Sequence, residues 1–196
     1  MIRRVVATLS LSSKAGLVFV SVLAFGPRTP EAHPLPSTTL TIASDDDSLD
    51  LSISLALHEL ALALPSVSDL AENPPDEPLP QVVMDILVAY FARHLSLVPA
   101  DQSDLSLKVT DARIHGAKAE DVGHYNLIAL ELTTPVAADR AVFPLTINYD
   151  AVMHEVRNHT ATVLWQTDDR QLLVVGTIAF DPVLGKAVPM VLAAEP

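Results

Sequence analysis

Cysteine is absent from the chain of 196 residues. Its absence excludes disulfide bonds, thiolate ligands for zinc or iron–sulfur clusters, and a thiol nucleophile. Glycine is scarce as well, with six in the whole chain, and none belongs to a P-loop, a G-x-G-x-x-G loop or a G-x-S-x-G elbow. Stability must therefore come from a packed core, and the usual signatures of nucleotide-binding proteins and serine hydrolases are missing.

Positively charged residues are also few: the chain has 12 Lys and Arg, compared with 24 Asp and Glu. Residues 33–196 alone hold 8 and 23 of these, which gives a formal charge of −15. A surface of this sign repels nucleic-acid phosphates and anionic lipid headgroups and attracts cations. We therefore expect no nucleic-acid partner and no electrostatic attachment to a membrane.

Long apolar runs are also rare. After the first 32 residues no run approaches the length of about 18 residues that indicates a membrane-spanning helix. One shorter run, residues 15–25, follows three cations near the amino terminus and has the pattern of a secretory signal peptide. Since a spanning helix needs about 20 apolar residues, we expect a cleaved leader rather than a retained anchor.

Two cleavage positions fit this leader, one after Ala24 and one after Ala32. Cleavage after Ala32 would make His33 the new amino terminus, where the free amine and the imidazole together can chelate a metal such as copper. The sequence thus predicts a leader over residues 1–32 and a single exported globular domain over residues 33–196.

The periodicity of apolar residues predicts a mainly β fold. Helical spacing predicts one amphipathic helix from Leu79 that ends near Pro99, and one to two turns after Leu57. Residues 65–80 are expected to form a loop, and His115 and His124 to lie in a polar connection between strands. Alternation predicts strands at residues 40–42, 49–57, 105–109, 128–132, 143–149, 159–165, 172–180 and 188–192. The expected architecture is a β-sandwich, with an immunoglobulin-like form as one candidate and the helix as an insertion; an open α+β sheet is the alternative.

Candidate ligands concentrate between the strands at residues 143–149 and 159–165. His154 and His159 flank this junction, and together with His33 they are the candidate ligands for nickel, copper or zinc. Their spacing of five excludes the zinc-protease helix motif, because five helical steps place two side chains roughly 140° apart. His159 and His94 lie on apolar faces, so a hydrogen-bonded core histidine is the structural alternative at both positions.

Three segments carry a resemblance to a known family. They are Ala32-His33-Pro34-Leu35-Pro36, Leu55-x-Leu57-x-Glu59-Leu60-x-Leu62-Ala63-Leu64, and Tyr149-Asp150 followed by His154-Glu155-Val156-x-Asn158-His159. In this order and spacing they resemble the exported amino-terminal region of HupE/UreJ-like bacterial membrane proteins. The resemblance implies a domain of the bacterial periplasm or envelope, in a family of accessory proteins of hydrogenase and urease linked to nickel uptake. It implies no permease activity, since the family's transmembrane helices do not follow in this sequence.

Three functions are compatible with these observations. The leading hypothesis is a non-enzymatic envelope binding or accessory domain with a membrane partner and a role in divalent metal handling. The second is a metal-dependent enzyme that uses His154 and His159. The third is a structural or adhesive β-sandwich. The sequence nominates no catalytic residue and no organic cofactor.

Overall fold

The computed structural model describes residues 37–45, 47–72, 79–103, 105–120, 122–137 and 141–196. The leader and His33 lie outside these residues, so the signal peptide, its cleavage site and a metal ligand at His33 stay predictions. Within the described ranges, no helix combines the length and the apolar character needed to cross a membrane.

The longest alternating stretch of the sequence lies at the centre of the larger sheet. β1 (Thr38–Asp45) and β2 (Ser48–Ala56) pair antiparallel as the predicted hairpin, with Leu40 opposite Ile53. Successive side chains of a strand point to opposite faces, so the leucines and isoleucines of both strands are buried and the residues between them are more exposed. The hairpin therefore supplies one wall of the core.

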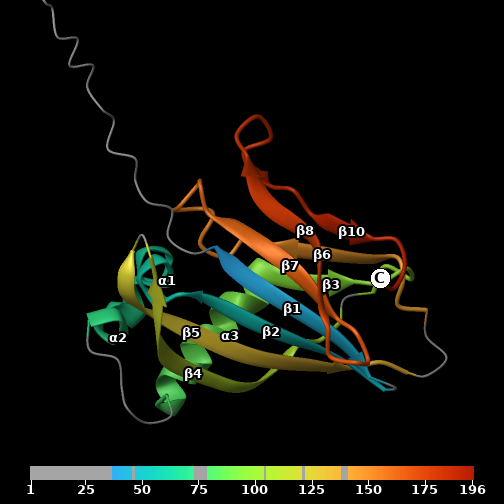
Figure 1. Ribbon diagram of the computed structural model, residues 1–196, viewed down its shortest axis with the longest axis horizontal. Helices are drawn as coiled ribbons and strands as arrows, with labels where there is room; N and C mark the ends of the chain where they lie inside the picture. The colour runs from blue at the N-terminus through green and yellow to red at the C-terminus, as the bar shows by residue number, and fades with distance from the viewer. Residues whose placement is uncertain (1–36, 46, 73–78, 104, 121, 138–140) are drawn as a thin grey trace, which may run out of the picture. The chain divides into compact units, whose positions relative to one another are not determined.

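The larger sheet has seven strands among the described residues, in the order β4-β5-β2-β1-β7-β8-β9. Neighbouring strands are antiparallel except β1 and β7, which run parallel (Figure 1). The remaining strands of this sheet are β4 (Lys108–Ala119), β5 (Gly123–Pro135), β7 (Thr160–Gln166), β8 (Leu172–Asp181) and β9 (Lys186–Ala187). The β1–β7 pair joins the early and late parts of the chain in the middle of the sheet.

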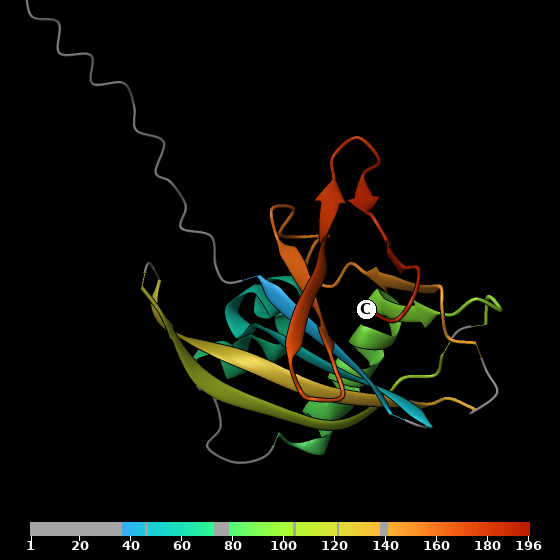
Figure 2. The ribbon, with the colours of Figure 1, turned by 45° about the vertical axis from the view of Figure 1, so that its right-hand side comes forward.

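A smaller sheet of three antiparallel strands has the order β10-β6-β3. Figures 1 and 2 show this sheet and the long helix α3 on the same side of the larger sheet. Its strands are β3 (Leu95–Val98), β6 (Leu145–Tyr149) and β10 (Met190–Leu192), and the helices are α1 (Leu57–Ala63), the 3-10 turn η1 (Pro65–Val67), α2 (Ser68–Glu72) and α3 (Gln81–His94).

One continuous apolar core lies between these layers. Trp165 of β7 is the largest fully buried side chain, and α3 contributes Leu87, Tyr90 and Phe91. The mainly β prediction is confirmed, as a large mixed sheet with a small second sheet. The immunoglobulin-like sandwich is not confirmed by this arrangement.

Two predicted boundaries are wrong. α3 ends at His94, well before Pro99, because Leu95 adopts an extended conformation with φ −144° and the alternating residues that follow form β3. Residues 65–72 form η1 and α2 rather than a loop. Pro65 is compatible with this, because the first helical residue has no intrahelical partner for its amide.

The polar connection predicted around His115 and His124 is also wrong. Both residues lie in paired strands, since β4 and β5 form a long hairpin in which His115 pairs with Leu127 and Lys118 with His124. Backbone hydrogen bonds form a ladder whatever the side chains are, and the side chains at this end are exposed or half-exposed. A strand without a buried face shows no alternation, so the pattern could not reveal it.

The turn between β8 and β9 lies at the end of a projecting hairpin (Figures 1 and 2), and its apolar residues Val183 and Leu184 are exposed to solvent. The Asp181 carboxylate accepts hydrogen bonds from the backbone N–H groups of Val183 and Leu184, at 2.7 and 3.1 Å. Gly185 closes the turn with φ +67°, a conformation that glycine adopts without strain. Val183 is 90% exposed, so this turn is held in place without contact between its apolar side chains and the core.

Replacement of Ile53 by alanine tests the assignment of the core. Ile53 is fully buried in β2, and we expect Ile53→Ala to lower the free energy of unfolding by about 2–5 kcal/mol in urea denaturation. The matched control is Val174→Ala, an exposed position of β8, where we expect a change within about 0.5 kcal/mol. Equal effects of the two substitutions would contradict the layer arrangement.

Candidate functional site

The turn between β6 and β7 separates two polar clusters. It begins at Asp150, directly after β6, and its backbone is closed by hydrogen bonds from Met153 N–H to Asp150 C=O and from Val156 N–H to Val152 C=O, at 3.1 and 2.9 Å. Residues 151–153 are fully buried. Polar side chains before and after this buried segment therefore fall into one cluster on the surface and another inside the core.

The inner cluster is a chain of four hydrogen-bonded side chains. Nδ1 of His159 lies 2.6 Å from Oε2 of Glu59 in α1, and its Nε2 lies 2.7 Å from Oγ1 of Thr38 at the start of β1. The same Oγ1 lies 3.0 Å from the hydroxyl of Tyr149, the last residue of β6. Thr38, His159 and Glu59 are 0, 4 and 5% exposed, so the chain is sealed in the core.

One order of protons satisfies every member of this inner cluster. With Glu59 as a carboxylate, Nδ1–H of His159 donates to it, Thr38 O–H donates to Nε2, and Tyr149 O–H donates to Thr38. Burial raises the pKa of the Tyr149 phenol far above its usual range, so its proton stays in place. Among the described residues, each buried side-chain nitrogen and oxygen has a hydrogen-bond partner.

The order Glu59, His159, Thr38 resembles a catalytic triad, in which a carboxylate orients an imidazole that activates a hydroxyl. Thr38 is fully buried, however, so a substrate carbonyl has no access to its oxygen. The inner cluster is therefore structural, and the prediction of a hydrogen-bonded core histidine at His159 is confirmed. Neither nitrogen of His159 is free to bind a metal while these contacts persist.

The outer cluster lies at the end of α3. Nδ1 of His94 is 2.8 Å from Oδ1 of Asp150, and the backbone N–H of Asp150 donates to the carbonyl of His94 at 3.0 Å. The ring of His154 stacks on that of His94, with centroids 4.8 Å apart and planes 9° apart, and the ring of Tyr90 lies 4.4 Å from His94 on centroids. His154 thus pairs with His94, and the structure does not bring it to His159.

Val152 gives the turn an unusual backbone. Its φ of +68° is a left-handed conformation that β-branched residues rarely adopt, at a cost of about 1–3 kcal/mol. Its N–H donates to the hydroxyl of Tyr90 at 2.9 Å, which ties the turn to α3. Burial raises the pKa of Tyr90 to about 12, so the phenol is neutral at physiological pH. The packing of Val152 and this hydrogen bond hold a turn that the local sequence alone disfavours.

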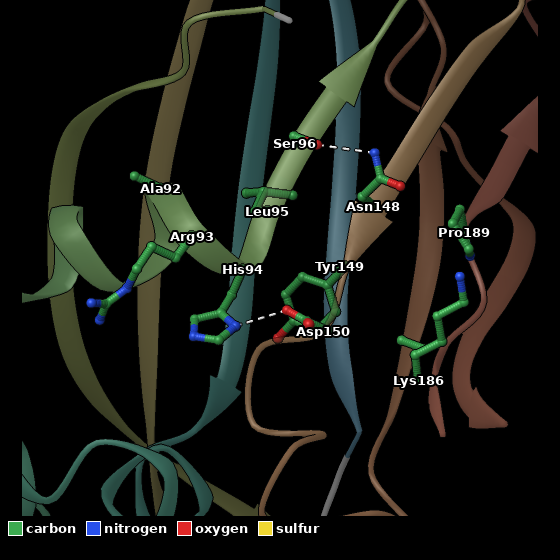
Figure 3. A pocket seen from close by; sticks show the side chains of 11 residues that line it. Ala92, Arg93, His94, Leu95, Ser96, Asn148, Tyr149, Asp150, Lys186 and Pro189 are labelled. Atoms are coloured by element: carbon green, nitrogen blue, oxygen red, sulfur yellow. Dashed lines mark hydrogen bonds and ion pairs between the residues drawn. The ribbon is translucent and has the colours of Figure 1, made fainter. Parts of the chain in front are cut away.

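A cavity of about 460 Å³ opens beside the outer cluster (Figure 3). It is lined by residues 92–96, 148–150, 186, 187 and 189. The His94–Asp150 pair lies in the middle of the view, with Arg93 on one side and Lys186 on the other. Nδ2 of Asn148 donates to Oγ of Ser96 at 3.0 Å across the β3–β6 pair. The lining is therefore polar and contains an imidazole, a carboxylate and two cations.

No three His, Asp or Glu side chains within the described part of the chain are placed to hold a metal ion together. His33 lies outside the described residues. Metal binding by His33, His154 and His159 stays a prediction, and His159 would have to leave its contacts with Glu59 and Thr38 to take part. The alternative of an enzyme built on a shared His154 and His159 site gains no support from their separate partners.

Sequence reasoning missed Glu59, Thr38 and Asp150 as members of these clusters. The signal at Asp150 was its place directly after a buried strand, beside a turn already selected for its histidines. Glu59 and Thr38 gave no comparable signal, because their contacts with His159 span 100 and 121 residues.

No model of a known protein family matches the chain, and no curated protein matches its sequence. The likeness to the exported region of HupE/UreJ-like proteins therefore stays a resemblance.

Loss of the imidazole at the centre of the inner cluster tests its structural role. His159→Ala leaves Glu59 and Thr38 buried without their partner, and we expect the free energy of unfolding to fall by about 3–5 kcal/mol. The matched control is His58→Ala, an exposed histidine of α1, with an expected change within about 0.5 kcal/mol. Both are measured by urea denaturation. A change at His159 below about 1 kcal/mol, which is the net contribution of one ordinary hydrogen bond, would contradict this structural role.

The raised pKa of Tyr90 predicts a loss of stability in alkali. Its pKa of about 12 in the folded protein exceeds the ordinary value of 10.0, so the unfolded chain releases this proton first as the pH rises. The contribution of the neutral Tyr90 phenol to the free energy of unfolding is complete below about pH 10 and is lost as the pH rises through about 12. We expect Tyr90→Phe to reduce this decline, measured as urea stability against pH with tyrosinate absorbance in parallel. An identical loss of stability with rising pH in the original protein and in Tyr90→Phe would show that Tyr90 does not cause this loss.

Proposed function

We propose that this chain is an exported, non-enzymatic binding or accessory domain of a bacterial envelope, associated with a membrane partner and with divalent metal ions. The pattern of residues 1–32, the resemblance to the exported region of HupE/UreJ-like proteins and the formal charge of −15 over residues 33–196 support this proposal.

The observation that carries the proposal is the contrast between the two polar clusters. The inner cluster has the order of a catalytic triad but is closed to solvent, whereas His94 and Asp150 of the outer cluster line an open cavity. His94 and Asp150 retain 20 and 54% exposure of their side chains. Accessible imidazole and carboxylate groups beside a cavity are suited to ligand binding.

The size and construction of the cavity fit this role. Its volume of about 460 Å³ lies within the usual range of small-ligand sites, about 300–1,000 Å³. Its walls come from the end of α3, the end of β6 and the segment after β8, which are distant in sequence. A rigid sheet and helix therefore position the polar groups, as a preformed binding site requires.

Metal ions enter the proposal through the chemistry of the available ligands. Imidazole nitrogen and carboxylate oxygen together suit nickel, copper and zinc. The acidic surface raises the local concentration of any cation. The same surface disfavours nucleic acid and anionic lipid as ligands. The resemblance to the exported region of HupE/UreJ-like proteins favours a membrane protein as the partner.

One observation favours the adhesive alternative. The projecting β8–β9 turn exposes Val183 and Leu184, and Leu172 and Val174 of β8 are exposed as well. Exposed apolar groups of this kind are typical of surfaces that contact other proteins. Val183→Ser would weaken an adhesive contact, while the binding function proposed here would persist.

Two measurements on the purified protein test the proposal. Titration calorimetry with Ni²⁺, Cu²⁺ and Zn²⁺ should detect binding, and cross-linking in intact bacterial cells followed by mass spectrometry should recover a membrane protein of the envelope. Val183→Ser serves as the control in the titration, since it changes an exposed side chain that does not line the cavity. The proposal fails if the protein binds none of the metals and recovers no envelope protein.

A further inference from the structure

We infer that His94 and His154 together bind a divalent transition metal through two imidazole nitrogens, with Asp150 as the positioning residue for His94. This inference rests on the metal-binding part of the proposed function and assigns it to residues. It pairs His154 with His94, whose ring the structure places beside it, instead of with His159, which the sequence grouped with His154 and His33 because it lies in the same turn as His154.

The hydrogen bond from His94 to Asp150 determines which nitrogen is available. Because the Asp150 carboxylate accepts the proton of Nδ1 at 2.8 Å, Nε2 of His94 carries the free lone pair. Nε2 has no hydrogen-bond partner among the described residues. Metal-binding histidines characteristically donate their second nitrogen to a carboxylate in this way, which fixes the tautomer and makes the ligand nitrogen more basic.

His154 supplies the second imidazole. Its side chain is exposed and makes no hydrogen bond to the described residues, and its ring lies parallel to that of His94 at 4.8 Å between centroids. Zinc–nitrogen bonds measure about 2.0–2.1 Å, so the ring of His154 must turn about its side-chain torsions until both nitrogens point at one ion. An exposed side chain can turn without disturbing the core, and water completes the coordination.

The backbone holds this pair together in two ways. The N–H of Asp150 donates to the carbonyl of His94, and the N–H of Val152 donates to the hydroxyl of Tyr90. The turn that carries His154 is thereby attached to α3, and Val152 keeps its left-handed φ of +68°. Backbone strain of this kind is characteristically retained where geometry matters for function.

The surrounding charge narrows the choice of metal. Arg93 and Lys186 line the same cavity and form no ion pair with a described residue, so their positive charge opposes a cation. Calcium and magnesium depend on several anionic oxygens, which this site does not offer. Nickel, copper and zinc bind imidazole nitrogen strongly enough to tolerate nearby positive charge.

Titration of the untagged protein and its variants tests the assignment. We expect Ni²⁺ or Zn²⁺ to bind with one ion per chain, Mg²⁺ and Ca²⁺ not to bind, and His154→Ala to weaken the affinity by at least about tenfold. Asp150→Asn should weaken it by about 10- to 100-fold through loss of the orienting carboxylate. The matched control is His124→Ala, an exposed histidine of β5, which should bind as the original protein does.

A second readout does not depend on affinity. In NMR spectra, Ni²⁺ should broaden the imidazole signals of His94 and His154 and leave those of His124 sharp. His94→Gln, which fills most of the same space, should abolish the broadening at His154, and circular dichroism confirms that this variant is folded.

Three results would decide against the inference. Unchanged binding in His154→Ala, or broadening centred on other histidines, overturns the site and leaves the proposed metal handling in place. If the original protein binds no metal, the inference and the metal part of the proposed function fall together. Recovery of a membrane partner, which is measured separately, then decides whether the accessory role survives.

Discussion

The hydrogen bond between Glu59 and His159 is the contact on which the arrangement of the chain depends. It joins α1 to the residue before β7, and through Thr38 and Tyr149 it reaches β1 and β6. A carboxylate removed from water is costly unless its partners are in place, so these four elements are stable only as a set. In a domain without disulfides, this polar chain supplements the apolar core in selecting one packing of the sheets.

The parallel pairing of β1 with β7 explains why such a contact exists. Parallel strands place residues from distant parts of the chain side by side, and Thr38 lies opposite Ala161, two residues after His159. The register therefore brings the hydroxyl of Thr38 to the imidazole. A shift of one residue would turn the whole apolar face of β1 toward solvent, so core packing and the polar chain require the same register.

Period-two alternation made most strands predictable, since Leu49 to Leu55 and Ala161 to Trp165 have one buried and one more exposed face. It failed for the outer part of the β4–β5 hairpin, where neither face is buried and pairing depends on the backbone alone. The candidate site was less predictable. His154 was selected by its position in a turn, but its neighbour His94 lies on a helix 60 residues earlier, and only tertiary packing brings their rings to 4.8 Å.

Tyr149 and Asp150 are consecutive residues that belong to opposite clusters, one inside the core and one at its surface. Since the end of a strand moves as a unit, displacement of Tyr149 from the buried chain would also move the carboxylate that holds His94. Ligand binding at the surface cavity is then coupled to the folding equilibrium, because only the folded protein presents the cavity. A ligand that binds the folded protein at Asp150 would therefore raise the melting temperature of the whole domain, including the core around Tyr149.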